Sequence, residues 1–252
     1  MVDAHEQASD TKCGFIALIG APNAGKSTLL NALVGSKVSI ISHKVQTTRA
    51  LIRGITIEGR SQLIFVDTPG IFSPRRRLDR AMVTTAWGGA HEADLVGVMI
   101  DARKGIDEEA EQILSRLGDV KPSKLLILNK IDVVAKEVLL ALADAANKAA
   151  KFEATFMVSA LTGDGVADLK AWLSDHVPRG PWLYPPEQMS DAPIRQLAAE
   201  ITREKLFERL HQELPYQSTV ETELWKELRA GDIRIEQTIY VERESQRKIV
   251  LG

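Results

Sequence analysis

Residues 20–27 (GAPNAGKS) contain the residue types and spacing of a phosphate-binding loop, G-x-x-x-x-G-K-[ST]. Its glycines let backbone N–H groups converge on phosphate oxygens. Lys26 would reach the β and γ phosphates, and the Ser27 hydroxyl would hold Mg²⁺. ATP and GTP enzymes share this pattern, so the loop predicts a nucleoside triphosphate without selecting the base. The predicted phosphate ligands are Gly20, Ala21, Pro22, Asn23, Ala24, Gly25, Lys26, Ser27 and Thr28.

Residues 67–70 (DTPG) provide the second part of the predicted phosphate and metal site. Asp67 would place a carboxylate near Mg²⁺, usually through a water molecule, and Gly70 would present its N–H to the γ-phosphate. Asp-x-x-Gly alone is common in turns. After a phosphate-binding loop in the same chain, it predicts a nucleotide site.

Residues 129–132 (NKID) select guanine. A carboxylate at Asp132 accepts from guanine N1–H and the exocyclic amine together, whereas adenine lacks both donors at this edge. Sites built on such matching reject analogues by ~10⁴–10⁵. The alternative is a polar strand end without a ligand. Asn129 would orient the loop, Lys130 would pack on the ring, and the Ala160 N–H would meet guanine O6. The predicted guanine site comprises Asn129, Lys130, Asp132, Ser159, Ala160 and Leu161.

Residues 42–49 lie where a GTPase carries its first switch. We favour Thr48 over Thr47 as the hydroxyl that joins Mg²⁺ when the γ-phosphate is present; otherwise both threonines simply begin a strand. The predicted metal ligands are thus Ser27, Thr48 and Asp67, and the predicted catalytic residues are Lys26, Thr48 and Gly70.

Ile71 follows the DTPG motif, where Ras-type enzymes place the glutamine that orients water. Its side chain forms no hydrogen bond, so we expect slow intrinsic turnover that depends on another group, a cation or a partner. Residues 75–77 (RRR), in the second switch region, are interpreted as a solvated face. The alternative is a contact to ribosomal RNA or another polyanion.

These motifs require a scaffold that gathers them at one edge. Short apolar runs alternate with helical periods from residue 14 to 159, which predicts a doubly wound, mostly parallel α/β sheet with its ligands at the carboxyl edge. The expected strands are 15–19, 51–57, 62–66, 95–100, 124–128 and 155–158. The expected helices are 26–34, 78–91, 107–117, 136–151 and 166–176.

Length and composition set the wider frame. The chain has 252 residues, enough for one and a half or two domains, and its net charge of −2 excludes a global basic field. Cys13 is the single cysteine, which fits a reducing cytosol. Neither a signal peptide nor a membrane-spanning run is present in the sequence. We therefore expect a cytoplasmic protein.

Four segments follow from the change in pattern along the chain. Residues 1–12 are expected to be disordered, 13–178 to form the GTPase domain, and 179–190 to be a stiff Pro/Gly linker. Residues 191–252 predict a small α+β domain, with a helix at 194–214 and strands at 218–224 and 233–241.

With these residues in place, the chain resembles the Era family of bacterial GTPases, within the Era/TrmE-like group. The signs in the GTPase region are Pro22-Asn23, residues 46–49 (QTTR), residues 67–70 and the missing glutamine. Residues 203–205 (REK), 213–216 (ELPY) and 240–244 (YVERE) resemble the carboxyl-terminal domain of that family. The resemblance implies a P-loop GTPase domain followed by a KH-type RNA-binding domain.

The resemblance also implies function and partners. Such a protein is a GTP/GDP switch that binds the 3′-terminal region of small-subunit ribosomal RNA and assists maturation and assembly of the small subunit. It implies Mg²⁺, a K⁺ ion held with the help of Asn23, a monomer, and peripheral association with the inner membrane in part of the population.

One departure from the family concerns RNA. A KH domain grips RNA through a G-x-x-G loop between two helices. Gly252 takes the place of the first glycine, so we expect an incomplete KH-type domain that binds single-stranded RNA poorly. Lys248 and Gly252 are the predicted remnants of the RNA site. Two rival hypotheses are a GTP-binding module that acts through protein partners and a tRNA-modification or tandem-domain GTPase.

Overall fold

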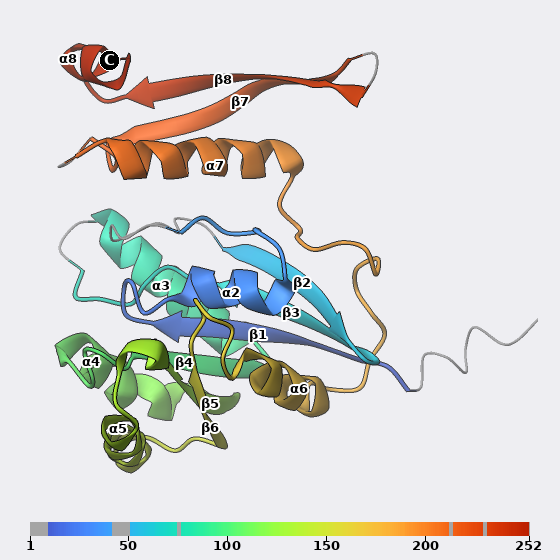
Figure 1. The fold of residues 1–252 in the computed structure, drawn as a ribbon, viewed down its shortest axis with the longest axis vertical. Coiled ribbons are helices and arrows are strands. Elements are labelled where there is room, and N and C mark those ends of the chain that lie inside the picture. The colour runs from blue at the N-terminus through green and yellow to red at the C-terminus, as the bar shows by residue number, and fades with distance from the viewer. Residues whose placement is uncertain (1–9, 42–50, 75–76, 212–213, 229–230, 252) are drawn as a thin grey trace, which may run out of the picture. The chain divides into compact units, whose positions relative to one another are not determined.

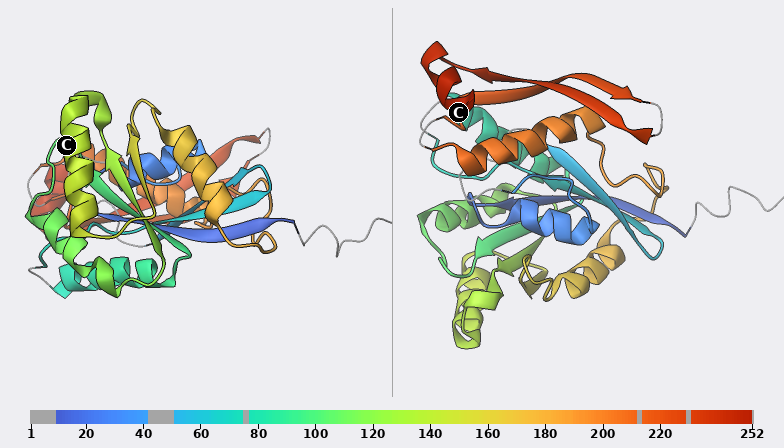
Figure 2. Two further views of the ribbon diagram at one scale, coloured as in Figure 1. Left: turned by 90° about the horizontal axis from the view of Figure 1, so that it is seen from below. Right: turned by 45° about the horizontal axis from the view of Figure 1, so that its top comes forward.

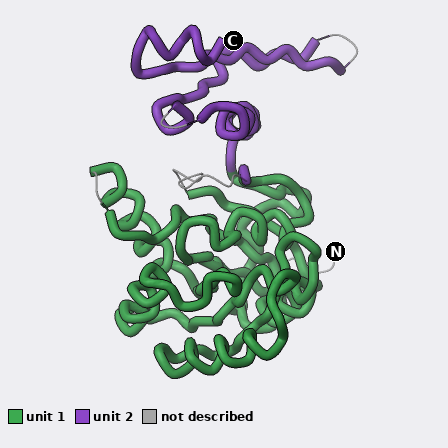
Figure 3. The backbone as a smooth tube through the Cα atoms, turned by 60° about the vertical axis from the view of Figure 1, so that its left-hand side comes forward, with its two compact units in different colours: residues 1–39, 48–191 green, residues 40–47, 192–252 purple. Residues whose placement is uncertain are grey.

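The computed structural model describes residues 10–41, 51–74, 77–211, 214–228 and 231–251. The chain divides into two compact units (Figure 3). The first contains residues 1–39 and 48–191, and the second contains residues 40–47 and 192–252.

The first unit is built on a six-stranded sheet with the strand order β2-β3-β1-β4-β5-β6 (Figure 1). Only β2 runs antiparallel to its neighbour β3; the other pairs are parallel. Every residue of β3 and β4 is buried, which explains the apolar runs within them at residues 63–66 and 95–100. The strands are β1 (Lys12–Gly20), β2 (Ile52–Glu58), β3 (Ser61–Asp67), β4 (Leu95–Asp101), β5 (Ser123–Asn129) and β6 (Ala154–Val158).

Helices cover both faces of this sheet, and Figure 2 shows the two layers. Alternate strand residues pack on α3, α4 and α5 on one face and on α2 and α6 on the other, which gives two large apolar clusters. The helices are α2 (Lys26–Val34), α3 (Arg77–Glu92), α4 (Glu108–Arg116), α5 (Lys136–Ala149) and α6 (Val166–His176), with short 3₁₀ turns at Leu117–Asp119 and Ile131–Val133.

The first strand begins inside the segment that the sequence predicts to be disordered. Lys12 opens β1 because its backbone N–H donates to the Arg60 carbonyl at 3.1 Å, and the Cys13 N–H donates to the Pro178 carbonyl at 3.0 Å. Residues 1–9 lie outside the described part of the chain.

The proline-rich segment after α6 is packed along the first unit rather than spanning solvent. The Gln62 side chain accepts from the backbone N–H groups of Leu183 and Tyr184, at 2.9 and 3.0 Å. At the edge strand β2, the Ile55 N–H donates to the Met189 carbonyl at 2.8 Å. The segment therefore satisfies backbone groups at an otherwise open sheet edge.

The second unit consists of α7 (Ile194–Arg209), an antiparallel ribbon of β7 (Ser218–Glu227) and β8 (Ile233–Val241), and α8 (Glu244–Leu251). In Figure 1, α7 lies along β7. Two features differ from the sequence expectation. The long helix ends at Arg209 instead of continuing to residue 214, because Leu210 turns extended and is buried. The short helix α8 was not predicted.

Candidate nucleotide-binding site

The predicted phosphate loop connects β1 to α2. Asn23 and Gly25 both have positive φ, 62° and 100°, and their conformations turn the backbone around the loop. Gly25 is required for a second reason, since a Cβ there would lie 2.2 Å from Asn129 Nδ2. The segment predicted to select the base is therefore packed directly on the phosphate loop.

Lys26 lies under this loop with only 7% of its surface exposed. Its Nζ donates to the carbonyl oxygens of Gly20 and Ala21, at 3.1 and 3.0 Å. Burial lowers the pKa of Lys26 to about 8, against the opposing influence of Asp67 and Glu109. Phosphate groups would supply the negative charge that favours the ammonium form.

Asp67, at the end of β3, is fully buried and lies beside the phosphate loop. Its Oδ2 accepts from the Ser27 hydroxyl at 2.7 Å and from the Ser39 hydroxyl at 2.8 Å. A hydroxyl and a carboxylate are hard oxygen donors of the kind Mg²⁺ takes alongside substrate phosphates and water. The residues present therefore fit a magnesium site.

Gly70 and Ile71 bring the end of the DTPG motif against the phosphate loop. A Cβ on Gly70 would lie 2.9 Å from the Pro22 backbone, and the Ile71 N–H donates to the Gly20 carbonyl at 3.0 Å. The Ile71 side chain is buried in the apolar cluster with α3. The position of the Ras glutamine is thus occupied by a core residue.

Asn129, at the end of β5, joins the phosphate loop to the segment after β6. Its Nδ2 donates to the Ala24 carbonyl at 2.8 Å, and its Oδ1 accepts from the Ala160 N–H at 3.0 Å. The Ala160 N–H expected to meet guanine O6 therefore has a side-chain acceptor in this structure, and the contact to O6 stays a prediction.

Asp132 and Ser159, both predicted guanine ligands, are directly hydrogen-bonded to each other. The Ser159 hydroxyl donates to Asp132 Oδ1 at 2.7 Å and accepts from the Thr162 N–H at 3.2 Å. Leu161, close by in the chain, is 81% exposed. The hydrogen bond from Ser159 orients the Asp132 carboxylate.

Lys130 has a partner that the motifs do not reveal. Its Nζ donates to the Asn23 carbonyl and to Asp101 Oδ2, both at 2.6 Å. Burial by itself raises the pKa of Asp101, but hydrogen bonds from Arg103 and Lys130 and the charge of Lys130 bring it below its ordinary value. Asp101 thus holds Lys130 across the phosphate loop as a buried carboxylate.

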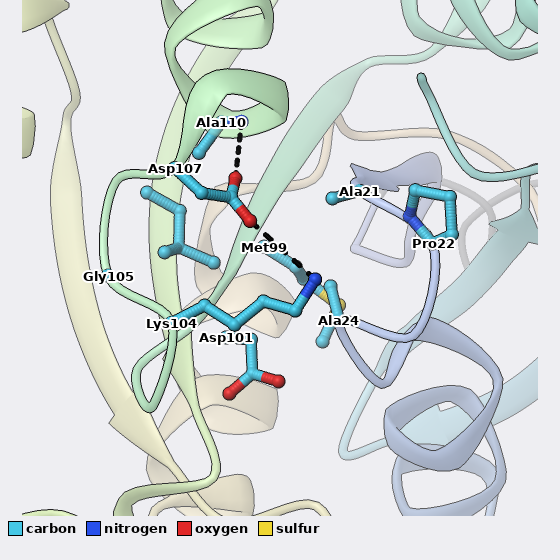
Figure 4. A pocket seen from close by; sticks show the side chains of 10 residues that line it. Ala21, Pro22, Ala24, Met99, Asp101, Lys104, Gly105, Asp107 and Ala110 are labelled. Carbon is cyan, nitrogen blue, oxygen red and sulfur yellow. Dashed lines mark hydrogen bonds and ion pairs between the residues drawn. The ribbon is translucent and has the colours of Figure 1, made fainter. Parts of the chain in front are cut away.

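A small pocket lies on the same side, between residues 21–24 of the phosphate loop and the turn after β4 (Figure 4). Lys104 and Asp107 form an ion pair of 3.6 Å across its rim, and Asp107 caps α4 by accepting from the Ala110 N–H. The pocket lies between the loop and this turn, and the residues that line it from the turn are not predicted nucleotide ligands.

Several predicted site residues fall outside the described residues. These are Thr48 with its alternative Thr47, the first two arginines of 75–77, and Gly252. Arg77 opens α3 and is exposed, and Lys248 is exposed on α8. Among the helices in the described ranges, none is long and apolar enough to cross a membrane.

Comparisons with known proteins agree with this geometry. A family model described as 50S ribosome-binding GTPase matches residues 15–130. GTPase Era of Afipia carboxidovorans is 69% identical over 247 residues, which cover 98% of this chain and 80% of the relative. GTPase Era of Brucella suis is 65% identical over 246 residues, with 98% and 79% covered. The chain belongs to the GTPase Era family.

Solved structures extend the match to both units. A crystal structure of Era in complex with MgGDPNP and nucleotides 1506–1542 of 16S ribosomal RNA superposes with a TM-score of 0.89 at 36% identity, over 96% of this chain and 83% of that one. A crystal structure of an Aquifex aeolicus Era variant bound to GDP·AlF₄⁻ gives the same values. The predicted family, the P-loop α/β fold and the GTPase class are therefore confirmed.

Proposed function

We propose that this protein is a GTP-hydrolysing switch that binds the 3′-terminal region of small-subunit ribosomal RNA and assists assembly of the small subunit. The observation that carries the nucleotide half is the convergence of three loops on the carboxyl edge of one sheet. Lys26, Asp67 and Asn129 come from different strand ends, yet direct hydrogen bonds link the loops that carry them.

In the proposed site the chain's own residues bind and orient the nucleotide. The phosphate loop would direct its N–H groups to the phosphates, Lys26 would place a positive charge at the β and γ phosphates, and Gly70 would donate to the γ-phosphate. Asp132 would accept from the guanine edge. Magnesium, held by Ser27, Asp67 and, in the triphosphate state, Thr48, would neutralise developing charge on the phosphates.

A potassium ion is the second proposed cofactor. Because Ile71 is a core residue, the site lacks a side chain at the Ras glutamine position that could orient water. Asn23, held in a left-handed conformation on the loop, is the proposed ligand. Comparing turnover in KCl and NaCl at equal ionic strength tests this role, and equal rates would contradict it.

The RNA half of the proposal rests on the match to Era bound to 16S ribosomal RNA, which covers 96% of this chain and so includes both units. The 50S description belongs to a model that matches residues 15–130 alone. We therefore favour the small-subunit RNA. Residues 13–178 form the proposed GTPase domain, 179–190 the linker, and 191–252 the KH-type part with Lys248 and Gly252 toward RNA.

The remaining proposals concern the cellular setting. We place the protein in the cytoplasm as a monomer, with peripheral association to the inner membrane in part of the population. Vesicle flotation with anionic lipids tests that association, and absence from the floated fraction would contradict it.

Binding of GDP and a non-hydrolysable GTP analogue, followed by RNA binding in each state, tests the function as a whole. The RNA would be the 3′-terminal sequence of 16S ribosomal RNA, with a scrambled sequence as the control. A chain extended to the length of its relatives should prefer the ribosomal sequence and respond to the nucleotide. Binding that ignores both sequence and nucleotide would favour the rival hypothesis of a module acting through protein partners.

A further inference from the structure

Ser39 stands out among the residues that the motifs leave unassigned. It is buried, with 1% of its surface exposed, and its hydroxyl donates to Asp67 Oδ2 at 2.8 Å. We propose that Ser39 is a positioning residue for the metal-binding carboxylate of Asp67. The proposal rests on the magnesium role proposed above for Ser27 and Asp67.

The backbone of Ser39 is fixed by a single asparagine of α2. Asn31 Oδ1 accepts from the N–H groups of Val38 and Ser39, at 2.9 and 3.0 Å, and Asn31 Nδ2 donates to the Ser39 carbonyl at 2.8 Å. Three hydrogen bonds thus anchor residues 38–39 to the helix whose first turn carries Ser27. The Ser39 hydroxyl is held at a defined point, so it can orient its acceptor.

Two hydroxyls share the same carboxylate oxygen. Ser27 and Ser39 both donate to Asp67 Oδ2, and they approach from the phosphate loop helix and from the segment after it. When the Ser27 oxygen turns its lone pair to a cation, Ser39 continues to hold the carboxylate. A fully buried carboxylate with a defined rotamer needs less reorganisation to engage a cation or its water shell.

The position of Ser39 in the chain adds a second consequence. Ser39 shortly precedes the segment that contains Thr48, the predicted metal ligand of the triphosphate state. Its hydrogen bond to Asp67 therefore fixes a point of the backbone before that segment, which itself lies outside the described residues.

Magnesium-dependent release of fluorescently labelled GDP tests the proposal. In the parent, Mg²⁺ should slow release relative to EDTA. Ser39→Ala should need at least about tenfold more Mg²⁺ for half of this slowing, because a hydrogen bond to a charged group contributes roughly that factor or more. Its release rate in EDTA should equal the parent's, since the contacts of GDP itself are kept.

Ser61→Ala is the matched control. Ser61 is a buried serine at the opposite end of β3, and its hydroxyl donates to the Ser174 carbonyl at 2.7 Å, away from the site. It should keep the parent's magnesium dependence. Ser39→Cys, which nearly keeps the side-chain volume but donates weakly, should also raise the magnesium requirement, and it covers the case in which Ser39→Ala does not fold.

Ser27→Ala distinguishes the positioning role of Ser39 from the proposed metal site. If Ser27→Ala loses magnesium dependence while both Ser39 variants keep the parent's, the positioning role is wrong and the proposed metal site stands. If Ser27→Ala also keeps it, the metal site itself is wrong. If the Ser39 variants released GDP faster by the same factor in EDTA and in Mg²⁺, Ser39 would contribute only to the general stability of the fold. That result would overturn the proposal.

Discussion

Strands β4 and β8 show how differently the two units are built. Every residue of β4 is buried between two helical layers, whereas each residue of β8 is exposed or half-buried, including Ile233 and Ile235 at 47% and 43% exposure. The candidate nucleotide site lies at the ends of β1, β3, β5 and β6, and the last residue of each of these strands is buried. Its side chains are therefore held by a core that fixes their backbone on both faces.

The second unit depends on fewer contacts. The ribbon of this unit packs on α7. Among the described residues of the unit, Phe207 is the largest fully buried side chain, and its ring lies edge to face with that of Tyr216, with 5.5 Å between the ring centroids. A unit held by one such layer opens at a lower free energy than a strand buried on both faces. The difference suggests that nucleotide chemistry and the second unit's order can be disrupted separately, and the following experiments test how far this holds.

The largest expected effect is on hydrolysis. Lys26→Ala should reduce the single-turnover rate of GTP cleavage by about 10³-fold or more, by analogy with the loss of other cations that stabilise phosphoryl transfer. Lys104→Ala, which removes a lysine near the same loop, is the control and should retain activity. The second unit should keep its amide protection in both variants. A cleavage rate near the parent's in Lys26→Ala would refute the assigned site.

The next effect concerns the second unit alone. Phe207→Ala should destabilise it locally by about 3–5 kcal/mol, the usual range for removing a buried aromatic side chain. Hydrogen exchange in β7 and β8 should accelerate while exchange in β4 and the affinity for GDP remain unchanged. Phe65→Ala, in the core of the first unit, should do the reverse. Equal loss of GDP affinity in the two variants would show that the units are not separable.

The same contrast explains what could be predicted from the sequence. Strands β3 and β4 were predictable because burial on both faces leaves a continuous apolar run. Helix α8 was missed, since its few apolar residues, such as Ile249 and Leu251, are exposed and form no clear period. The length of α7 was overestimated because the apolar spacing continues past the point where Leu210 leaves the helix.

The site shows a similar division. The assignments of Lys26 and Asp132 come from local spacing within one motif, and they stay predictions. Ser39 and Asp101 could not be assigned in this way, because each acquires its role from a partner 28 or 29 positions away in the chain, Asp67 and Lys130 respectively. Only the fold brings these pairs within hydrogen-bond distance.

A smaller effect should appear in base selection. Asp132→Asn should lower GTP affinity by about tenfold or more and favour XTP, because the amide donates to the xanthine carbonyl and no longer accepts from the guanine amine. Asp164→Asn changes a carboxylate of the neighbouring loop, bound to the Thr162 hydroxyl at 2.8 Å, and should leave both affinities unchanged. Unchanged GTP and XTP dissociation constants in Asp132→Asn would remove the basis for the guanine site.

The smallest effect tests whether Asp101 slows nucleotide release by holding Lys130 in place. Asp101→Asn leaves a neutral acceptor for Lys130, so the lysine should be held less firmly across the phosphate loop. Release of GDP and of a GTP analogue should accelerate by about three- to tenfold alike, in line with the replacement of a charge-assisted hydrogen bond by a neutral one. The preference for guanine should persist, because the predicted base-reading carboxylate of Asp132 is unchanged. Arg103→Ala removes the other side-chain donor to Asp101 and keeps the donor from the Arg103 backbone N–H. Because the Arg103 side chain is 52% exposed, this variant should have a weaker effect. If Asp101→Asn altered base preference but not release, Lys130 would act on the base and not as a clamp between two loops.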